Sequence, residues 1–167
     1  MKAEGRVWKF DHNVNTDVIT AGKYLFLPMA ELAQHTLEVL NPAFAKEVKP
    51  GDLLVAGRNF GCGSSREHSP QVLKHLGVGA VLAESFARIF HRNAVAIGLP
   101  VMTVPGLWEQ TPDGARLKVD LAAGEVIDLG SGAHFQGRAL PPKMLEVLSQ
   151  GGILPALKQI GKQQSES

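Results

Sequence analysis

Residues 53–68 decide the fold of this chain, and they read Leu53-Leu54-Val55-Ala56-Gly57-Arg58-Asn59-Phe60-Gly61-Cys62-Gly63-Ser64-Ser65-Arg66-Glu67-His68. The apolar run 53–56 suits a short buried strand, and three glycines then turn the chain toward a helix that we expect over 66–76. A buried strand, a glycine-rich loop and a helix in this order are typical of a crossover unit in a parallel sheet.

The segments on either side of this stretch extend the same pattern. We predict further strands over 5–10, 78–83 and 99–104, and helices over 29–40 and 85–97. Beyond Pro105 the pattern changes to an alternating hairpin, a last strand and two helices, expected over 116–120 with 125–129, 135–140, 141–150 and 153–160. The prediction is therefore a single α/β domain over residues 1–161, with a parallel or mixed core sheet, helices packed around it, and a C-terminal hairpin plus helices. The polar tail 162–167 is expected to be disordered.

Composition narrows the class of protein. The 167 residues carry a formal charge of +1 and are 44% hydrophobic, which favours a globular domain and gives no reason to expect nucleic acid as a partner. No apolar run has the length of a signal peptide or a membrane span, so we expect no membrane partner and a cytoplasmic location. The single cysteine, Cys62, cannot form an internal disulfide and cannot alone hold an iron–sulfur cluster.

The glycine-rich loop has the chemistry of an anion site. Glycines let a ligand approach the backbone closely, and the first free N–H groups of the following helix attract negative charge. Arg66 adds a planar fork for a carboxylate or phosphate, and Ser64 and Ser65 place two hydroxyls at the same point. The pattern is neither a Walker loop nor a GxGxxG turn. Ser64 and Glu67 also fit a helix capping box, which needs no ligand, so capping and anion binding both stay open.

A second polar cluster, Asn13-Val14-Asn15-Thr16-Asp17-Val18-Ile19-Thr20, follows the first expected strand. Its carboxylate and hydroxyls could orient a hydroxy-acid substrate. The alternative is an Asx turn in which the polar side chains bond only to their own backbone.

Taken together, these two stretches resemble the aconitase superfamily. The matching residues are Asn15-Thr16-Asp17-Val18-Ile19-Thr20, Gly22-Lys23-Tyr24-Leu25, the run 57–68 quoted above, and Glu84-Ser85-Phe86-Ala87-Arg88-Ile89-Phe90. The resemblance is to the mobile swivel domain, which forms a separate small subunit in isopropylmalate isomerases and prokaryotic homoaconitases. It implies a compact swivel fold of the β/β/α type.

The resemblance also implies a reaction and its participants. Such enzymes are hydro-lyases that move a hydroxyl between adjacent carbons of a small dicarboxylate by dehydration and rehydration, in leucine biosynthesis for the isopropylmalate enzymes. A [4Fe–4S] cluster would sit on a partner large subunit, in a heterodimer or heterotetramer, and this chain would bind no cofactor or metal. By the motif match Ser64 is the catalytic base, Ser65 and Arg66 hold a substrate carboxylate, and Asp17 and Thr20 are polar groups near the active site.

The substrate is expected to be set by Leu25, Phe26 and Leu27, which follow the Tyr24-Leu25 match. Relatives that act on tricarboxylic acids tend to carry an arginine here, whereas this run is apolar and suits an isopropyl or methyl group. The resemblance therefore favours 3-isopropylmalate, with 2-methylmalate, 2,3-dimethylmalate and homoaconitate as alternatives. These side chains could instead only pack within the protein.

Two other classes of function compete with the enzyme subunit. A stand-alone carboxylate-binding module would use the same loop without catalysis. An RNA-binding regulator is disfavoured by the near-neutral charge and by the lack of a stripe of aromatic and basic residues.

Overall fold

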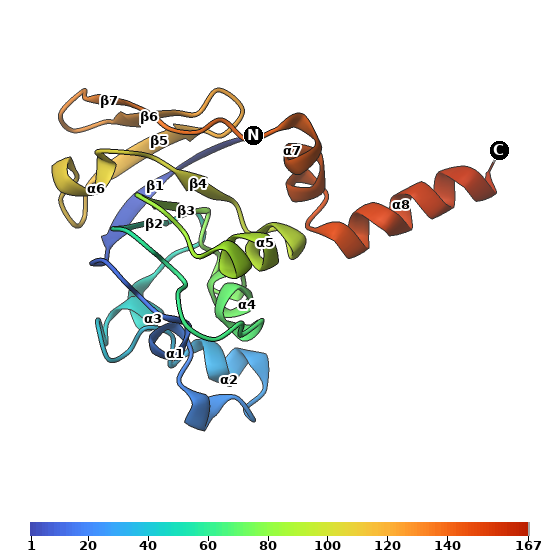
Figure 1. Cartoon of the computed structure of the whole chain (residues 1–167), viewed down its shortest axis with the longest axis horizontal. Helices are drawn as coiled ribbons and strands as arrows, with labels where there is room; N and C mark the ends of the chain where they lie inside the picture. The colour runs from blue at the N-terminus through green and yellow to red at the C-terminus, as the bar shows by residue number, and fades with distance from the viewer. Residues whose placement is uncertain (167) are drawn as a thin grey trace.

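The computed structural model describes residues 1–166, in which seven strands form one sheet in the order β4-β3-β2-β1-β5-β6-β7 (Figure 1). Strands β1 to β4 run parallel, and β5 to β7 add an antiparallel extension beside β1. The strands are β1 (Lys2–Lys9), β2 (Leu53–Ala56), β3 (Ala80–Ala83), β4 (Val101–Thr103), β5 (Arg116–Asp120), β6 (Glu125–Asp128) and β7 (His134–Gln136). The mixed α/β fold predicted from the sequence is thereby confirmed.

Strand β1 joins the two halves of the sheet. Its first part pairs antiparallel with β5, with Gly5 opposite Leu117, and its end pairs parallel with β2, with Val7 opposite Leu53. At the junction a Cβ on Gly5 would lie 2.2 Å from the carbonyl oxygen of Gly51, so only glycine fits there. The long β1 therefore lets one sheet carry both a parallel core and an antiparallel edge.

Helices cover both faces of the parallel part, and each face has its own hydrophobic core. Because side chains alternate along a strand, Leu54 and Val81 enter one core while Leu53 and Leu82 enter the other. The helices are α1 (Thr16–Ile19), the 3₁₀ turn η1 (Gly22–Tyr24), α2 (Met29–Ala33), α3 (Phe44–Glu47), α4 (His68–His75), α5 (Arg88–Ala96), α6 (Leu107–Gln110), α7 (Pro142–Ser149) and α8 (Ile153–Ser165). The last of these projects from the body of the domain (Figure 1).

Most elements differ from their predicted bounds by a few residues, and three differ by more at one end. The helix expected over 29–40 ends at Ala33, because Leu37 adopts a positive φ of 56° and donates its N–H to the carbonyl of Ile19. The strand expected over 135–140 ends at Gln136, after which the N–H of Arg138 bonds to Thr103. Helix α8 continues through Ser165 into the tail expected to be disordered, since its lysines and glutamines are good helix formers. Ser167 lies outside the described residues.

The carboxyl ends of the parallel strands set the place of the site. β1 to β4 point the same way, so the loops that follow them emerge at one edge of the sheet. The polar cluster 13–20 follows β1 and the glycine-rich loop follows β2. Ligands of open α/β sheets bind at this edge. Among the described residues no helix is long and apolar enough to cross a membrane.

Candidate active site

The two motif loops are held together by their backbones. The N–H of Thr16 donates to the carbonyl of Cys62 at 2.9 Å, and the N–H of Gly61 donates to the carbonyl of Val14 at 2.8 Å. Asn15 and Cys62 form a parallel β-bridge between these two bonds. Cys62 thus joins the loops through its backbone. Its half-buried thiol forms no disulfide.

The first loop folds into the short helix α1, which presents Asp17. Asn15 caps this helix, since its Oδ1 accepts a hydrogen bond from the N–H of Val18 at 2.9 Å. The local side-chain-to-backbone bonding expected for this cluster is therefore made by Asn15. Because Asn15 caps the helix, the carboxylate of Asp17 is free to contact the glycine-rich loop.

The hydroxyl of Ser64 lies at the centre of a polar cluster. Its Oγ lies 3.3 Å from Asp17 Oδ1, to which it donates, and 3.2 Å from Arg66 Nε, from which it accepts. The hydroxyl of Thr16 lies 3.2 Å from the same oxygen and also donates to the carbonyl of Ser64 at 2.7 Å. Ser64 is exposed, so its oxygen is open to a ligand while three side chains fix its position.

Arg66 binds both motif loops at once. Its Nη2 forms an ion pair with Asp17 Oδ1 at 2.9 Å, and its Nη1 donates to the carbonyl of Thr20 at 3.0 Å. The Arg66 side chain is 24% exposed, against 60% for Asp17, so the guanidinium is partly desolvated while its partner faces water. The two sequence-predicted groups are therefore brought together as one charged pair around Ser64.

The other two predicted polar residues take different places. The hydroxyl of Thr20 is buried and lies 2.7 Å from the hydroxyl of Ser69, so it supports the loop rather than facing a ligand. Ser65 is exposed, and within the described part of the chain its hydroxyl makes no hydrogen bond. Ser65 is thus free to bind a ligand, whereas Thr20 holds Arg66 through its carbonyl.

The predicted specificity residues follow on the same loop. A Cβ on Gly22 would lie 3.3 Å from both terminal nitrogens of Arg66, so the chain passes directly against the guanidinium here. Four residues later Phe26 is 82% exposed, the most exposed large apolar side chain among the described residues. Leu25 and Leu27 are half-buried, and Leu27 packs against the core. An apolar side chain therefore projects from the loop that passes Arg66 at Gly22.

Tyr24, His35 and Glu38 form a brace that supports this loop. The ring of Tyr24 stacks on that of His35, with centroids 3.8 Å apart, and His35 Nδ1 donates to Glu38 at 2.9 Å. That hydrogen bond lowers the pKa of Glu38 below its ordinary value, with a smaller contribution in the same direction from Tyr24. The brace fixes the residue immediately before the specificity segment.

The capping box that Ser64 and Glu67 could form by their spacing is absent. Helix α4 begins at His68, and its N-cap residue, Glu67, makes no side-chain capping bond. Ser64 lies outside the helix because its side chain bonds to Thr16, Asp17 and Arg66 instead. The groups that face its hydroxyl are therefore side chains, and not the helix amides expected to bind an anion.

Two residues of the site were given no individual role from the sequence. Thr16, which is buried, bonds to Ser64, and Ser69, which is fully buried, bonds to Thr20 and to the carbonyl of Thr16. Ser69 lies four residues after Ser65, one turn into the region expected to be helical. A serine on an otherwise apolar helix face needs a hydrogen-bond partner, and this could have marked Ser69 from the sequence.

The side chains of this chain do not fit an iron–sulfur cluster. Cys62 is the only cysteine in the sequence, and such clusters are held by several thiolates. Among the described residues no group of three histidine, cysteine, aspartate or glutamate side chains is close enough to hold a metal ion. A cluster used in the reaction would have to be bound by another chain.

Comparisons with known proteins show the family of this chain. The family model of the aconitase C-terminal domain matches residues 13–105. The isopropylmalate/citramalate isomerase small subunit of Methanocaldococcus jannaschii is 49% identical over 93% of this chain and 94% of its own length. The methanogen homoaconitase small subunit of Methanothermobacter thermautotrophicus is 48% identical over 90% of this chain and 87% of its own length.

A solved structure agrees over the whole chain. The crystal structure of 3-isopropylmalate dehydratase from Methanocaldococcus jannaschii superposes with a TM-score of 0.93, at 38% identity, and covers 99% of both chains. This chain therefore belongs to the aconitase C-terminal domain family. The resemblance drawn from the two motif loops is confirmed.

Proposed function

We propose that this chain is the small subunit of a hydro-lyase that interconverts 2-isopropylmalate and 3-isopropylmalate by dehydration and rehydration. The observation that carries the proposal is the cluster of Ser64, Arg66 and Asp17, with the apolar loop around Phe26 next to it. The Ser64 cluster suits a carboxylate and a proton transfer, and the loop around Phe26 suits an alkyl group.

Ser64 is the proposed base. Its oxygen takes the proton from the substrate carbon next to a carboxylate, and Asp17 Oδ1 accepts the hydroxyl proton along the existing hydrogen bond. Arg66 Nε donates to the serine oxygen and stabilises negative charge as it develops there. Rehydration returns the proton by the same route.

Arg66 and Ser65 are the proposed carboxylate ligands. The guanidinium is planar and is fixed by Asp17 and Thr20, so little of its freedom remains to be lost when a carboxylate binds. The exposed hydroxyl of Ser65 supplies a further donor beside it. Because Asp17 competes for the same guanidinium, the substrate carboxylate has to share or displace that ion pair.

The apolar loop supports isopropylmalate as the substrate. Phe26 projects from the segment that starts against Arg66, so an alkyl group of a bound substrate would lie near this ring. The extra carboxylate of a tricarboxylic acid would lack a cationic partner there, which is costly in a closed site. The second candidate is a related substrate, 2-methylmalate, 2,3-dimethylmalate or homoaconitate, because the names of the relatives include citramalate isomerase and homoaconitase.

The remaining parts of the enzyme are proposed to lie on a large subunit that carries a [4Fe–4S] cluster. When bound, such a cluster supplies a Lewis acid for the substrate hydroxyl. The cytoplasm is the expected compartment, since the one thiol is unpaired.

The experiment is a substrate panel assayed on the complex. This chain is co-expressed with the cluster-bearing large subunit of the same genome, purified without oxygen, and given 3-isopropylmalate, 2-methylmalate, 2,3-dimethylmalate and homoaconitate. Turnover restricted to the substrates with an apolar end is expected. A preference for homoaconitate would overturn the substrate, and tight carboxylate binding without turnover would favour a binding module.

A further inference from the structure

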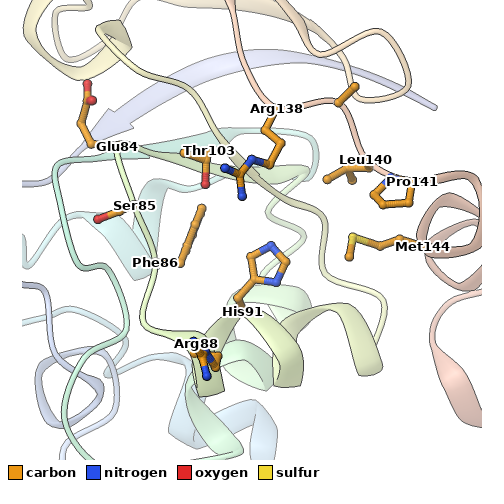
Figure 2. A pocket seen from close by; sticks show the side chains of 11 residues that line it. Glu84, Ser85, Phe86, Arg88, His91, Thr103, Arg138, Leu140, Pro141 and Met144 are labelled. Atoms are coloured by element: carbon orange, nitrogen blue, oxygen red, sulfur yellow. The ribbon is translucent and has the colours of Figure 1, made fainter.

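A cavity separate from the Ser64 cluster opens between the ends of β3 and β4, helix α5 and the segment that leads into α7 (Figure 2). Its volume of about 660 Å³ falls in the range of small-molecule sites. None of its lining residues forms a hydrogen bond or ion pair with Asp17, Ser64 or Arg66. The cavity therefore has no direct polar contact with the Ser64 cluster.

Two arginines line the cavity from opposite walls. Arg88 stands at the first position of α5, and Arg138 follows β7 on the antiparallel edge. Within the described part of the chain neither guanidinium donates a hydrogen bond or forms an ion pair. Figure 2 shows the guanidinium of Arg138 directed into the cavity, toward His91 and Thr103. Two cations without acceptors in one cavity favour an anionic ligand.

The net charge of the lining fits a single negative charge. Burial of the His91 ring, and to a lesser extent the neighbouring Arg138, lowers the pKa of His91, so this ring is neutral at pH 7. The carboxylate of Glu84 accepts the N–H of Gly106 at 2.9 Å and is turned away from the centre of the cavity. Two arginines and one glutamate leave a net charge of one positive unit, which a monoanion balances and a phosphate dianion exceeds.

Apart from Ser85 and Thr103, the rest of the lining is apolar. The ring of Phe86 forms one wall, and Leu140, Pro141 and Met144 form the wall opposite (Figure 2). An apolar lining of this kind holds an alkyl or aryl tail and leaves polar groups unsatisfied. The ligand thus combines one carboxylate with an apolar body.

We propose that this cavity is a second binding site, for a small monocarboxylate with an apolar tail. The carboxylate pairs with Arg138 and Arg88, and the tail lies between Phe86 and Met144. The proposed site binds its ligand without a chemical step.

The test is an NMR titration of the ¹⁵N-labelled full chain. The chain is titrated first with 4-methylpentanoate and then, separately, with 4-methylpentanamide, a neutral molecule of the same shape. Saturable shifts of the amides of residues 84–91, 138–140, 143 and 144, with the acid only, are expected. Arg138→Gln should raise the Kd at least about tenfold, since a charged hydrogen bond is lost. Arg88→Gln is a second variant on the opposite wall. Arg92→Gln is the matched control, an exposed arginine one turn later on α5 that lies outside the cavity, and should leave the Kd within about twofold.

Several results would overturn the proposal. Equally tight binding of the amide or of inorganic phosphate would refute a monocarboxylate as the ligand. Equal weakening by Arg92→Gln and Arg138→Gln would mean that only the overall positive charge matters. Shifts centred on residues 16–20 and 64–66 would assign the acid to the Ser64 cluster. Loss of binding on adding the large subunit would assign this face to the partner.

Discussion

Replacing Arg66 with lysine separates the charge of this residue from its shape. The arginine contacts three groups at once, Asp17 at 2.9 Å, the carbonyl of Thr20 at 3.0 Å and Ser64 Oγ at 3.2 Å. A lysine ammonium is a point charge on a flexible stem, and it cannot reproduce a planar fork that meets three acceptors. Arg66→Lys keeps the charge and loses the geometry.

The cost to folding is small. The ion pair is worth no more than about 1 kcal/mol, because Asp17 is 60% exposed and solvent screens the pair. The hydrogen bond to the buried carbonyl of Thr20 contributes about 1 kcal/mol. The free energy of unfolding should therefore fall by about 1–2 kcal/mol, and the variant should remain folded.

The cost to catalysis is larger. Ser64 loses its charged donor, and removal of one such preorganised donor lowers kcat by about 10²–10³. Loss of the carboxylate fork adds a rise in KM of about tenfold. The loss of activity therefore exceeds anything that partial unfolding of the variant could produce.

The assay is steady-state kinetics of the co-purified complex, with urea denaturation of this chain measured in parallel. Arg58→Lys is the matched control, an exposed arginine of the same loop whose side chain makes no hydrogen bond or ion pair within the described residues. A kcat within threefold of wild type for Arg66→Lys would refute the role of the guanidinium at Ser64. Equal losses in both variants would indicate a general effect of the loop.

Three further changes follow from the same structure. Gly61→Ala places a Cβ 2.2 Å from the ring of Phe90 at a φ of +82°, and should lower the free energy of unfolding by about 2–5 kcal/mol in a urea titration, where a change below 1 kcal/mol would contradict this packing. The hydrogen bond from His35 lowers the pKa of Glu38 from its ordinary value of 4.5, so the stabilisation it gives is present above that pH and is lost as the pH falls through the folded-state pKa. Glu38→Gln should therefore reduce the drop in the urea midpoint between about pH 6 and pH 3.5. An unchanged drop would contradict this role of Glu38. Phe26→Arg should raise kcat/KM for homoaconitate relative to isopropylmalate at least about tenfold, while an unchanged ratio would place the substrate tail elsewhere.

The sequence predicted the strands and most helices because their patterns are local. The buried runs 53–56 and 80–83 have the uninterrupted apolar character of parallel strands, and the hairpin 116–128 alternates as an antiparallel edge does. The helix expected over 29–40 ended early because Leu37 bonds to Ile19, a contact 18 residues away that no local pattern records. Long-range backbone bonds of this kind override helical spacing.

The site was only partly predictable for the same reason. The motifs gave Ser64, Arg66 and Asp17, and the structure brings the three within hydrogen-bonding distance of one another. Spacing could not show that Thr20 turns inward to Ser69, since burial depends on how the loop after β1 packs against α4. The cavity beside α5 combines residues 84–91 with 138–144, and only the fold brings those segments together.

The most direct test of the account is the kcat of the co-purified complex with Ser64→Ala, read together with exchange of the substrate proton in D₂O. The account predicts a fall in turnover and in exchange of about 10²–10⁴, a KM within about threefold, and unchanged stability of this exposed position. Ser65→Ala, its neighbour, should mainly raise KM. Turnover of Ser64→Ala within tenfold of wild type, with exchange preserved, would contradict the claim that this chain supplies the base.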